Sequence, residues 1–235
     1  MKIRAVIFDL YGTLLEVGPR PPDAATRWNR VWRETLGAAP RLNFGEFEAA
    51  CREVVAAEHA AARGRGILFP EVYWPAVVDA VLPEFARLPA AVRNASPVFS
   101  AGLMHSVRLA PGAGEALRAA DEAALHLGLA SNCQPYSLRE LDAALEIAGL
   151  KRDRFQPDLS FFSFEYGFSK PDPHVFQLLT ARLRARGIAP AETIMVGDSI
   201  DNDLVPARAC GWQTFAIQAG SATGWARLRE LFLHL

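Results

Sequence analysis

The chain opens with a short apolar segment that ends abruptly in an aspartate. Residues 3–8 are apolar apart from one arginine, and Asp9 follows them directly. A short apolar run bounded by turn residues is typical of a buried strand in a parallel sheet. Ligands of such sheets bind outside the carboxyl ends of the strands, so we expect Asp9 where chemistry takes place. Asp9 is therefore a candidate nucleophile, a metal ligand or both; an aspartate that only caps a turn is the alternative.

Short polar side chains follow this segment and a second apolar segment. Gly12 lets the chain turn back after Asp9, and Thr13 can form a local hydrogen bond or bind an anionic oxygen. Ser131 and Asn132 end the second apolar segment and offer hydrogen-bonding groups to a phosphate or carboxylate. Serine and asparagine are also favoured helix caps, so they could simply begin a helix near residue 136.

A lysine stands in the third segment of interest. Lys170 lies between a turn at Gly167 and a helix whose first turn suits Pro173. A lysine in such a loop is usually a solvated charge. Its setting beside Pro171 favours a fixed position.

Acidic residues gather after a fourth apolar segment. Residues 193–197 form another expected strand, and Asp198, Asp201 and Asp203 follow it. Like charges so close together repel one another unless a cation neutralises them, and magnesium prefers oxygen ligands. Acids at a helix N-terminus are the alternative; it explains Asp201 and Asp203 better than Asp198.

Taken together, these four motifs resemble those of the haloacid dehalogenase (HAD) superfamily of hydrolases. They stand in the family order and cover nearly the whole chain. The resemblance implies that Asp9 is the nucleophile and that Ser131 binds phosphate. It further implies that Lys170 steadies both groups, and that Asp198 and Asp203 are the acids of a magnesium site.

The chain departs from the phosphatase pattern at Tyr11. Phosphatases of the superfamily usually carry an aspartate there, as general acid and base, and the tyrosine form resembles the dehalogenase branch. Dehalogenases, however, usually have a Ser-Asn type of loop where this chain has Gly197 and Asp198. In the family the residue at position 11 gives its backbone carbonyl to magnesium, so Tyr11 remains a candidate metal ligand as well as a catalytic residue.

We therefore favour a magnesium-dependent phosphatase that forms an aspartyl-phosphate on a small phosphorylated metabolite. Gly12, Thr13, Ser131 and Asn132 are the expected substrate-binding residues. A metal-free 2-haloacid dehalogenase that forms an aspartyl ester is the first alternative, and Arg33 is then a candidate for its carboxylate-binding arginine. A regulatory or binding protein with little turnover is the second.

The pattern of periodicity predicts an α/β protein: a Rossmann-like, doubly wound parallel sheet with an all-helical cap inserted after the first strand. We assign residues 1–16 and 106–235 to the core and 17–105 to the cap. Helical spacing is expected in the cap at 23–37, 43–63, 71–81 and 84–95. Further strands are expected near 125–131, 158–163, 193–197 and 213–217.

Composition limits the classes of partner. The 235 residues carry a formal net charge of −1, which gives no support for nucleic-acid binding. No apolar run is long enough to span a bilayer, and we expect no signal peptide because Asp9 interrupts the first apolar stretch. Three widely spaced cysteines fit reduced thiols. These features predict a cytoplasmic enzyme with a small-molecule substrate.

Overall fold

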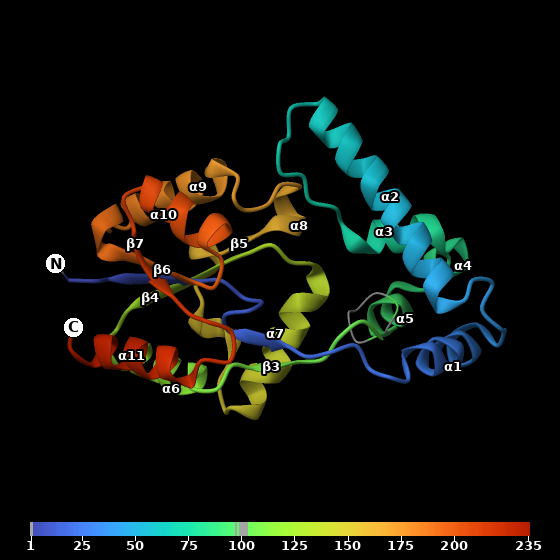
Figure 1. Ribbon diagram of the computed structural model, residues 1–235, viewed down its shortest axis with the longest axis horizontal. Helices are drawn as coiled ribbons and strands as arrows, with labels where there is room; N and C mark the ends of the chain where they lie inside the picture. Colours follow the sequence, from blue (N-terminus) through green and yellow to red (C-terminus); the bar gives the residue numbers. More distant parts are fainter. Residues whose placement is uncertain (1, 97, 99–102) are drawn as a thin grey trace.

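A five-stranded parallel sheet forms the centre of the computed structural model, which describes residues 2–96, 98 and 103–235. Its strands lie in the order β5-β4-β1-β6-β7 (Figure 1). Their bounds are β1 Ala5–Phe8, β4 His126–Ser131, β5 Phe161–Phe162, β6 Thr193–Gly197 and β7 Gln213–Ala216. The predicted α/β fold with a parallel sheet is confirmed.

Helices cover both faces of this sheet, and the alternation of β1 shows why. Val6 and Phe8 belong to a cluster of buried side chains on one face, whereas Ala5 and Ile7 belong to a cluster on the other. Successive strand residues point to opposite faces, so a strand buried on both sides is apolar throughout. The first cluster is covered by α6 Ala113–Glu122, α7 Pro135–Ile147 and α11 Ala222–Leu233; the second by α9 Pro173–Ala185 and α10 Val205–Ala209.

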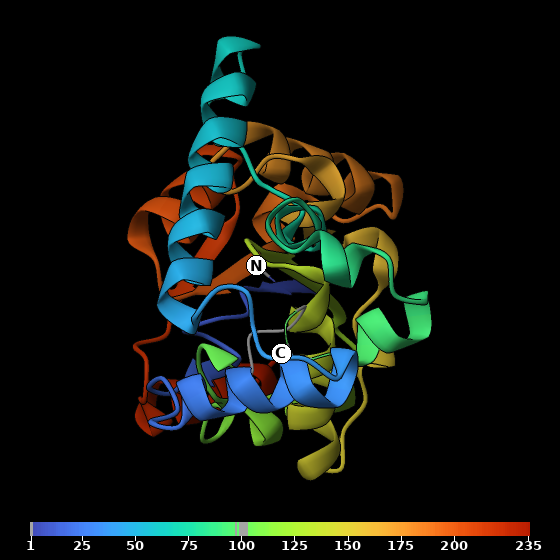
Figure 2. The same cartoon turned by 90° about the vertical axis from the view of Figure 1, so that its right-hand side faces the viewer.

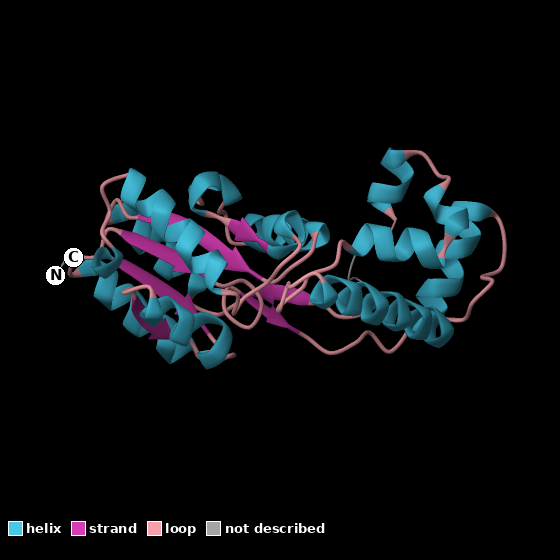
Figure 3. Ribbon diagram, turned by 90° about the horizontal axis from the view of Figure 1, so that it is seen from above, coloured by secondary structure: helices cyan, strands magenta, loops and turns pink. Residues whose placement is uncertain are grey.

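A helical insertion separates β1 from the rest of the sheet. It lies between β2 Leu15–Val17 and β3 Val107–Leu109, which pair in antiparallel fashion. Its helices are α1 Ala24–Leu36, α2 Phe44–Gly64, α3 Trp74–Val81, α4 Pro83–Ala86 and α5 Ala90–Ala95. Figures 1 and 3 show these helices beyond the carboxyl ends of the sheet strands, and Figure 2 looks onto them with the sheet behind.

The insertion has its own apolar core. Trp28 is fully buried and stacks on Phe47 with ring centroids 4.7 Å apart. Trp32 packs edge-on against Phe85 at 5.2 Å. Asn43 and Glu46 form a reciprocal capping box that satisfies free N–H groups at the start of α2. The two tryptophans thus pack among the insertion helices, as their spacing of one turn indicates.

The structure differs from the predicted elements in three places. Residues 158–163 form only the two-residue strand β5, because Pro157 begins a 3₁₀ turn, Pro157–Leu159, before it. The predicted helix over 84–95 is interrupted at Pro89, which separates α4 from α5. Strands β2 and β3 were not predicted, because three residues are too few to show a period of two.

The remaining elements are short. They are α8 Ser163–Tyr166, a π-helical turn Ile200–Leu204, and 3₁₀ turns Arg152–Arg154 and Pro190–Glu192. Residues 97 and 99–102, near the end of the predicted cap, lie outside the described residues. None of the helices in the described part of the chain combines the length and the apolar character that crossing a bilayer requires.

Candidate active site

The polar residues identified in the sequence meet at the carboxyl edge of the sheet. Asp9 directly follows β1, Ser131 ends β4 and Asp198 directly follows β6. Strands β4 and β6 flank β1 on either side with parallel pairing. Since all three strands point the same way, their terminal residues converge on one small region.

Lys170 is the electrostatic centre of this region. Its ammonium nitrogen lies 2.6 Å from Asp9 Oδ1 and 2.5 Å from Asp203 Oδ1, and its side chain is buried. Burial opposes the positive charge, but the two carboxylates outweigh burial and raise the pKa of Lys170 above its ordinary value. Lys170 is therefore a fixed cation that approaches from the loop before α9.

Asp9 is buried beside that cation. Burial raises the pKa of Asp9 to about 6, with Asp203 adding to the effect and Lys170 opposing it. Its Oδ2 accepts a hydrogen bond of 3.2 Å from Thr13 Oγ1, a hydroxyl that is itself fully buried. A carboxylate held by two separate donors has a defined orientation, which suits an attacking group.

Gly12 is required where the chain turns after Asp9. Its φ is +83°, and a Cβ at this position would lie 2.3 Å from Asp198 Oδ2. A side chain would therefore collide with the carboxylate and strain the backbone. The glycine lets Asp198 approach the turn that carries Asp9.

Three carboxylates surround the single ammonium group. Oxygens of Asp9, Asp198 and Asp203 all lie within 4.8 Å of one another. Burial, followed by the charge of Asp203, raises the pKa of Asp198. An all-oxygen donor set with an excess of negative charge fits a hard divalent cation such as magnesium.

Asp203 links Lys170 to the loop after β6 through its two carboxylate oxygens. Its Oδ1 binds Lys170 Nζ, and its Oδ2 accepts a hydrogen bond of 3.1 Å from the backbone N–H of Ser199. Both oxygens thus already have protein donors. Asp203 is fitted to orient Lys170 and the loop after β6. Asp9 also has a donor on each oxygen, so Asp198 has the freest oxygens of the three acids for a metal.

Asn132 holds the backbone of Lys170. Its side-chain amide donates to the Lys170 carbonyl at 2.8 Å and accepts from the Lys170 N–H at 2.7 Å. The helix cap expected at Ser131 or Asn132 is instead supplied by Gln134. Ser131 Oγ is buried and has no hydrogen-bond partner in the described part of the chain, so this hydroxyl is available to a ligand.

Tyr11 contacts two residues that the sequence did not single out. Its hydroxyl donates to Glu140 Oε2 at 2.5 Å, and its ring meets the His105 ring edge-on at 5.9 Å. Glu140 Oε1 also lies 3.5 Å from His105 Nε2. Burial, followed by the hydrogen bond to Glu140, raises the pKa of Tyr11 above its ordinary value, so the phenol keeps its proton.

The other candidates in the sequence lie apart from this centre or are inert. Arg33 is exposed on α1, where its Nε donates to the carbonyl of Asn29. Cys133 is buried, and burial raises the pKa of its thiol to about 12. A protonated thiol is a poor nucleophile, so Cys133 is a packing residue.

Comparison with models of known protein families finds a match that covers most of the chain. A family model described as haloacid dehalogenase-like hydrolase matches residues 3–211. Among curated protein sequences, none matches this chain.

Solved structures share the fold at low sequence identity. A HAD family enzyme from Bacteroides thetaiotaomicron is 16% identical, with 94% of this chain and 96% of that chain covered and a TM-score of 0.59. An L-2-haloacid dehalogenase is 23% identical over 92% of this chain and 87% of its own, with a TM-score of 0.50. A HAD phosphatase from Thermococcus onnurineus is 22% identical over 93% and 86%, with a TM-score of 0.50. The family model spans most of the chain, and these structures have the same fold: this protein belongs to the haloacid dehalogenase-like hydrolase family.

Proposed function

We propose that this hydrolase is a magnesium-dependent phosphatase that acts on a small phosphorylated metabolite through an aspartyl-phosphate on Asp9. The observation that carries the proposal is the meeting of Asp9, Asp198 and Asp203 around one lysine. This excess of negative charge at a buried centre favours a bound cation. A metal-free reaction on an anionic haloacid does not require this excess of negative charge.

In the proposed reaction, a carboxylate oxygen of Asp9 attacks phosphorus and the bond to the leaving-group oxygen breaks. Lys170, already beside Asp9, neutralises charge on the phosphoryl oxygens. Ser131 Oγ is free to donate a hydrogen bond to one of them. Water then attacks phosphorus, which releases inorganic phosphate and restores Asp9.

Magnesium, held by Asp9, Asp198 and the Tyr11 carbonyl, would supply charge neutralisation at the phosphoryl group. The Bacteroides HAD family enzyme has been solved in complex with magnesium and inorganic phosphate. Asp203 completes the proposed site by orienting Lys170.

We further propose that the helical insertion serves as a cap over this site. A segment of the insertion contacts the loop that precedes Lys170: Ser169 N donates to Phe69 O at 2.8 Å, and Glu71 N donates to Gly167 O at 3.0 Å. Gln134, near Ser131, binds the same segment. A cover of this kind excludes bulk water from a reactive intermediate.

One observation favours the dehalogenase alternative. Position 11 carries a phenol that is bound to Glu140 and keeps its proton, so it is a poor base. Halide leaves as an anion and needs no proton from the enzyme. The alternative is tested in the same experiment as the main proposal.

The test is a panel of phosphate monoesters, acyl phosphates and 2-haloacids, each assayed with magnesium and with a chelator. We expect magnesium-dependent release of phosphate and no release of halide. Asp9→Asn should abolish turnover, and Asp201→Asn, which removes an acid outside the cluster, should leave it intact.

Two results would contradict the proposal. Release of halide in the presence of the chelator would establish the dehalogenase. Absence of turnover on every compound, with the protein folded, would favour a regulatory or binding role.

A further inference from the structure

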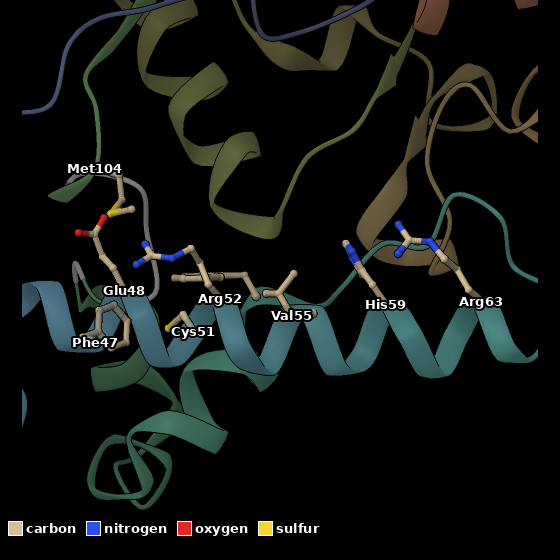
Figure 4. A pocket seen from close by; sticks show the side chains of 10 residues that line it. Phe47, Glu48, Cys51, Arg52, Val55, His59, Arg63 and Met104 are labelled. Atoms are coloured by element: carbon tan, nitrogen blue, oxygen red, sulfur yellow. The ribbon is translucent and has the colours of Figure 1, made fainter.

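A cavity of about 550 Å³ lies along one side of helix α2 (Figure 4). Its apolar wall is formed by Phe47, Cys51, Val55, Trp74 and Met104. Burial, followed by the charge of Glu48, raises the pKa of the Cys51 thiol to about 12, so that wall is uncharged at neutral pH. The wall can pack against a ring or a branched chain.

Basic side chains share this helix face with the apolar wall. Arg52, His59 and Arg63 also line the cavity. Their spacing of seven and four residues places them on one side of a helix, with His59 and Arg63 separated by about 6 Å along the axis. Figure 4 shows all three side chains extending from α2 toward the core.

These basic groups lack protein counter-charges. Glu48 lines the same cavity, but Arg20 binds it through two hydrogen bonds. Within the described residues, neither Arg52 nor Arg63 forms an ion pair, and the buried Nε2 of His59 has no hydrogen-bond partner. Cationic side chains beside an uncompensated ring nitrogen attract an anion.

The lining residues connect directly to the candidate active site. The backbone N–H of Trp74 donates to Gln134 Oε1 at 2.8 Å, close behind Ser131 and Asn132 in the chain. Met104 precedes His105, whose ring contacts Tyr11. The cavity is thus linked to the surroundings of the candidate active site through Trp74 and Met104.

We propose that this cavity binds the leaving group of the substrate, and that the leaving group combines an apolar body with a second anionic group. The apolar wall takes the body, and His59 and Arg63, one helical turn apart, take the anion. This inference rests on the proposed phosphatase function and names its substrate class. A carboxylate and a second phosphate would be bound by the same basic side chains, so either could be this anionic group.

The experiment compares aryl phosphates that differ only at the far end of the ring. 4-Carboxyphenyl phosphate and 1,4-phenylene bisphosphate carry the second anion, and 4-carboxamidophenyl phosphate is the neutral match. We expect kcat/KM for at least one anionic compound to exceed that of the carboxamide by about tenfold or more, as for a hydrogen bond to a charged group. Arg63→Met should remove most of this preference.

Arg33→Met is the matched control, since Arg33 is an exposed arginine of α1 outside the cavity. It should keep the preference. Equal kcat/KM for all three phosphates, with turnover dependent on Asp9, would overturn this inference and leave the phosphatase proposal standing.

Binding of the matching phosphonates provides a readout that does not depend on turnover. Calorimetry should show tighter binding of an anionic phosphonate than of its carboxamide analogue, and the difference should fall in Arg63→Met. If no phosphate is hydrolysed but this difference is present, the phosphatase proposal fails and the anion site stands. If the difference is absent, the anion site is wrong.

Discussion

At the scale of single residues, the site combines one buried cation with three acids that differ in exposure and in hydrogen bonding. Lys170 binds Asp9 and Asp203 at once. Asp9 and Asp203 each have protein donors on both oxygens, whereas Asp198 is exposed and close to Gly12. Burial is the leading cause of the raised pKa of Asp9, so its charged state depends on neighbouring cations.

The first prediction concerns pH. The pKa of Asp9 rises from its ordinary value to about 6 on folding, so the folded protein binds the extra proton between pH 4 and 6. The contribution of the Asp9 carboxyl to the free energy of unfolding is therefore greatest below that pH range and is lost as the pH rises through it. In chelator at pH 7, Asp9→Asn should be more stable to urea than the native protein.

The comparison of the two proteins at pH 4 is the control, because most of the difference should vanish there. A native protein that is more stable than Asp9→Asn at pH 7 would show that the ion pair with Lys170 outweighs burial.

The second prediction concerns Tyr11. Because burial and Glu140 keep its phenol protonated, Tyr11 cannot relay a proton as a tuned carboxylate does. The native enzyme should hydrolyse aryl and acyl phosphates much faster than alkyl phosphates, whose leaving groups need protonation. Tyr11→Asp should raise kcat/KM for alkyl phosphates, by up to ~10²–10⁴-fold.

Tyr11→Phe is the matched control for this change, since it removes the hydroxyl and adds no acid. It should give no such gain. If alkyl and aryl phosphates are hydrolysed equally by the native enzyme, another group supplies the proton.

At the scale of elements, short signals decide where the helices begin and end. Proline residues begin α3 and α4 near their first turn and separate α4 from α5. The capping box of Asn43 and Glu46 starts α2, the helix that carries the proposed leaving-group site. Thus the helix that carries Arg52, His59 and Arg63 begins at a cap residue, Asn43, that lies nine or more residues before them.

The third prediction tests that cap. Asn43→Ala removes the acceptor for the Glu46 N–H, which lies 3.0 Å away. It should lower the free energy of unfolding by about 1 kcal/mol, measured by urea denaturation. Asn29→Ala, an exposed position within α1, is the control and should cause no loss. Equal stability of the two variants would contradict a role for the cap.

At the scale of the whole molecule, the insertion is joined to the core by more than its two chain connections. Gln134 donates to Glu71 Oε1 and to the Val72 carbonyl, and it accepts from the Trp74 N–H. Ser163 adds a hydrogen bond of 2.7 Å to the other oxygen of Glu71. These contacts hold the segment between α2 and α3 against the carboxyl edge of the sheet.

The fourth prediction follows from this docking. Gln134→Ala removes three hydrogen bonds, each worth about 1 kcal/mol, between the insertion and the core. Amide hydrogen exchange over residues 69–74 should become faster, and KM should rise more than kcat falls. Gln156→Ala, which disturbs contacts to His126 and Arg186 instead, should change neither. Unchanged exchange at 69–74 in Gln134→Ala would show that other contacts hold the segment.

The sequence by itself determined the parallel core. A strand buried on both faces is a run of apolar residues, and polar or turn residues mark where each run ends. The resemblance of four sequence motifs to those of the HAD superfamily grouped Asp9, Lys170, Asp198 and Asp203, since these residues stand in the family order. The assignment of catalytic roles to these residues, and the division into core and cap, stay predictions.

Only the tertiary structure decided which side chains meet across long separations. Tyr11 and Glu140 are 129 residues apart, and Lys170 and Asp9 are 161 apart. The two-stranded pair β2 and β3 is too short for a periodic signal, yet it joins the two chain segments that lead into and out of the insertion. Which residues of α2 face the core, Arg52 and Arg63 among them, likewise depends on how the insertion packs. Periodicity reports whether a residue is buried; what it touches depends on the packing of elements distant in the chain.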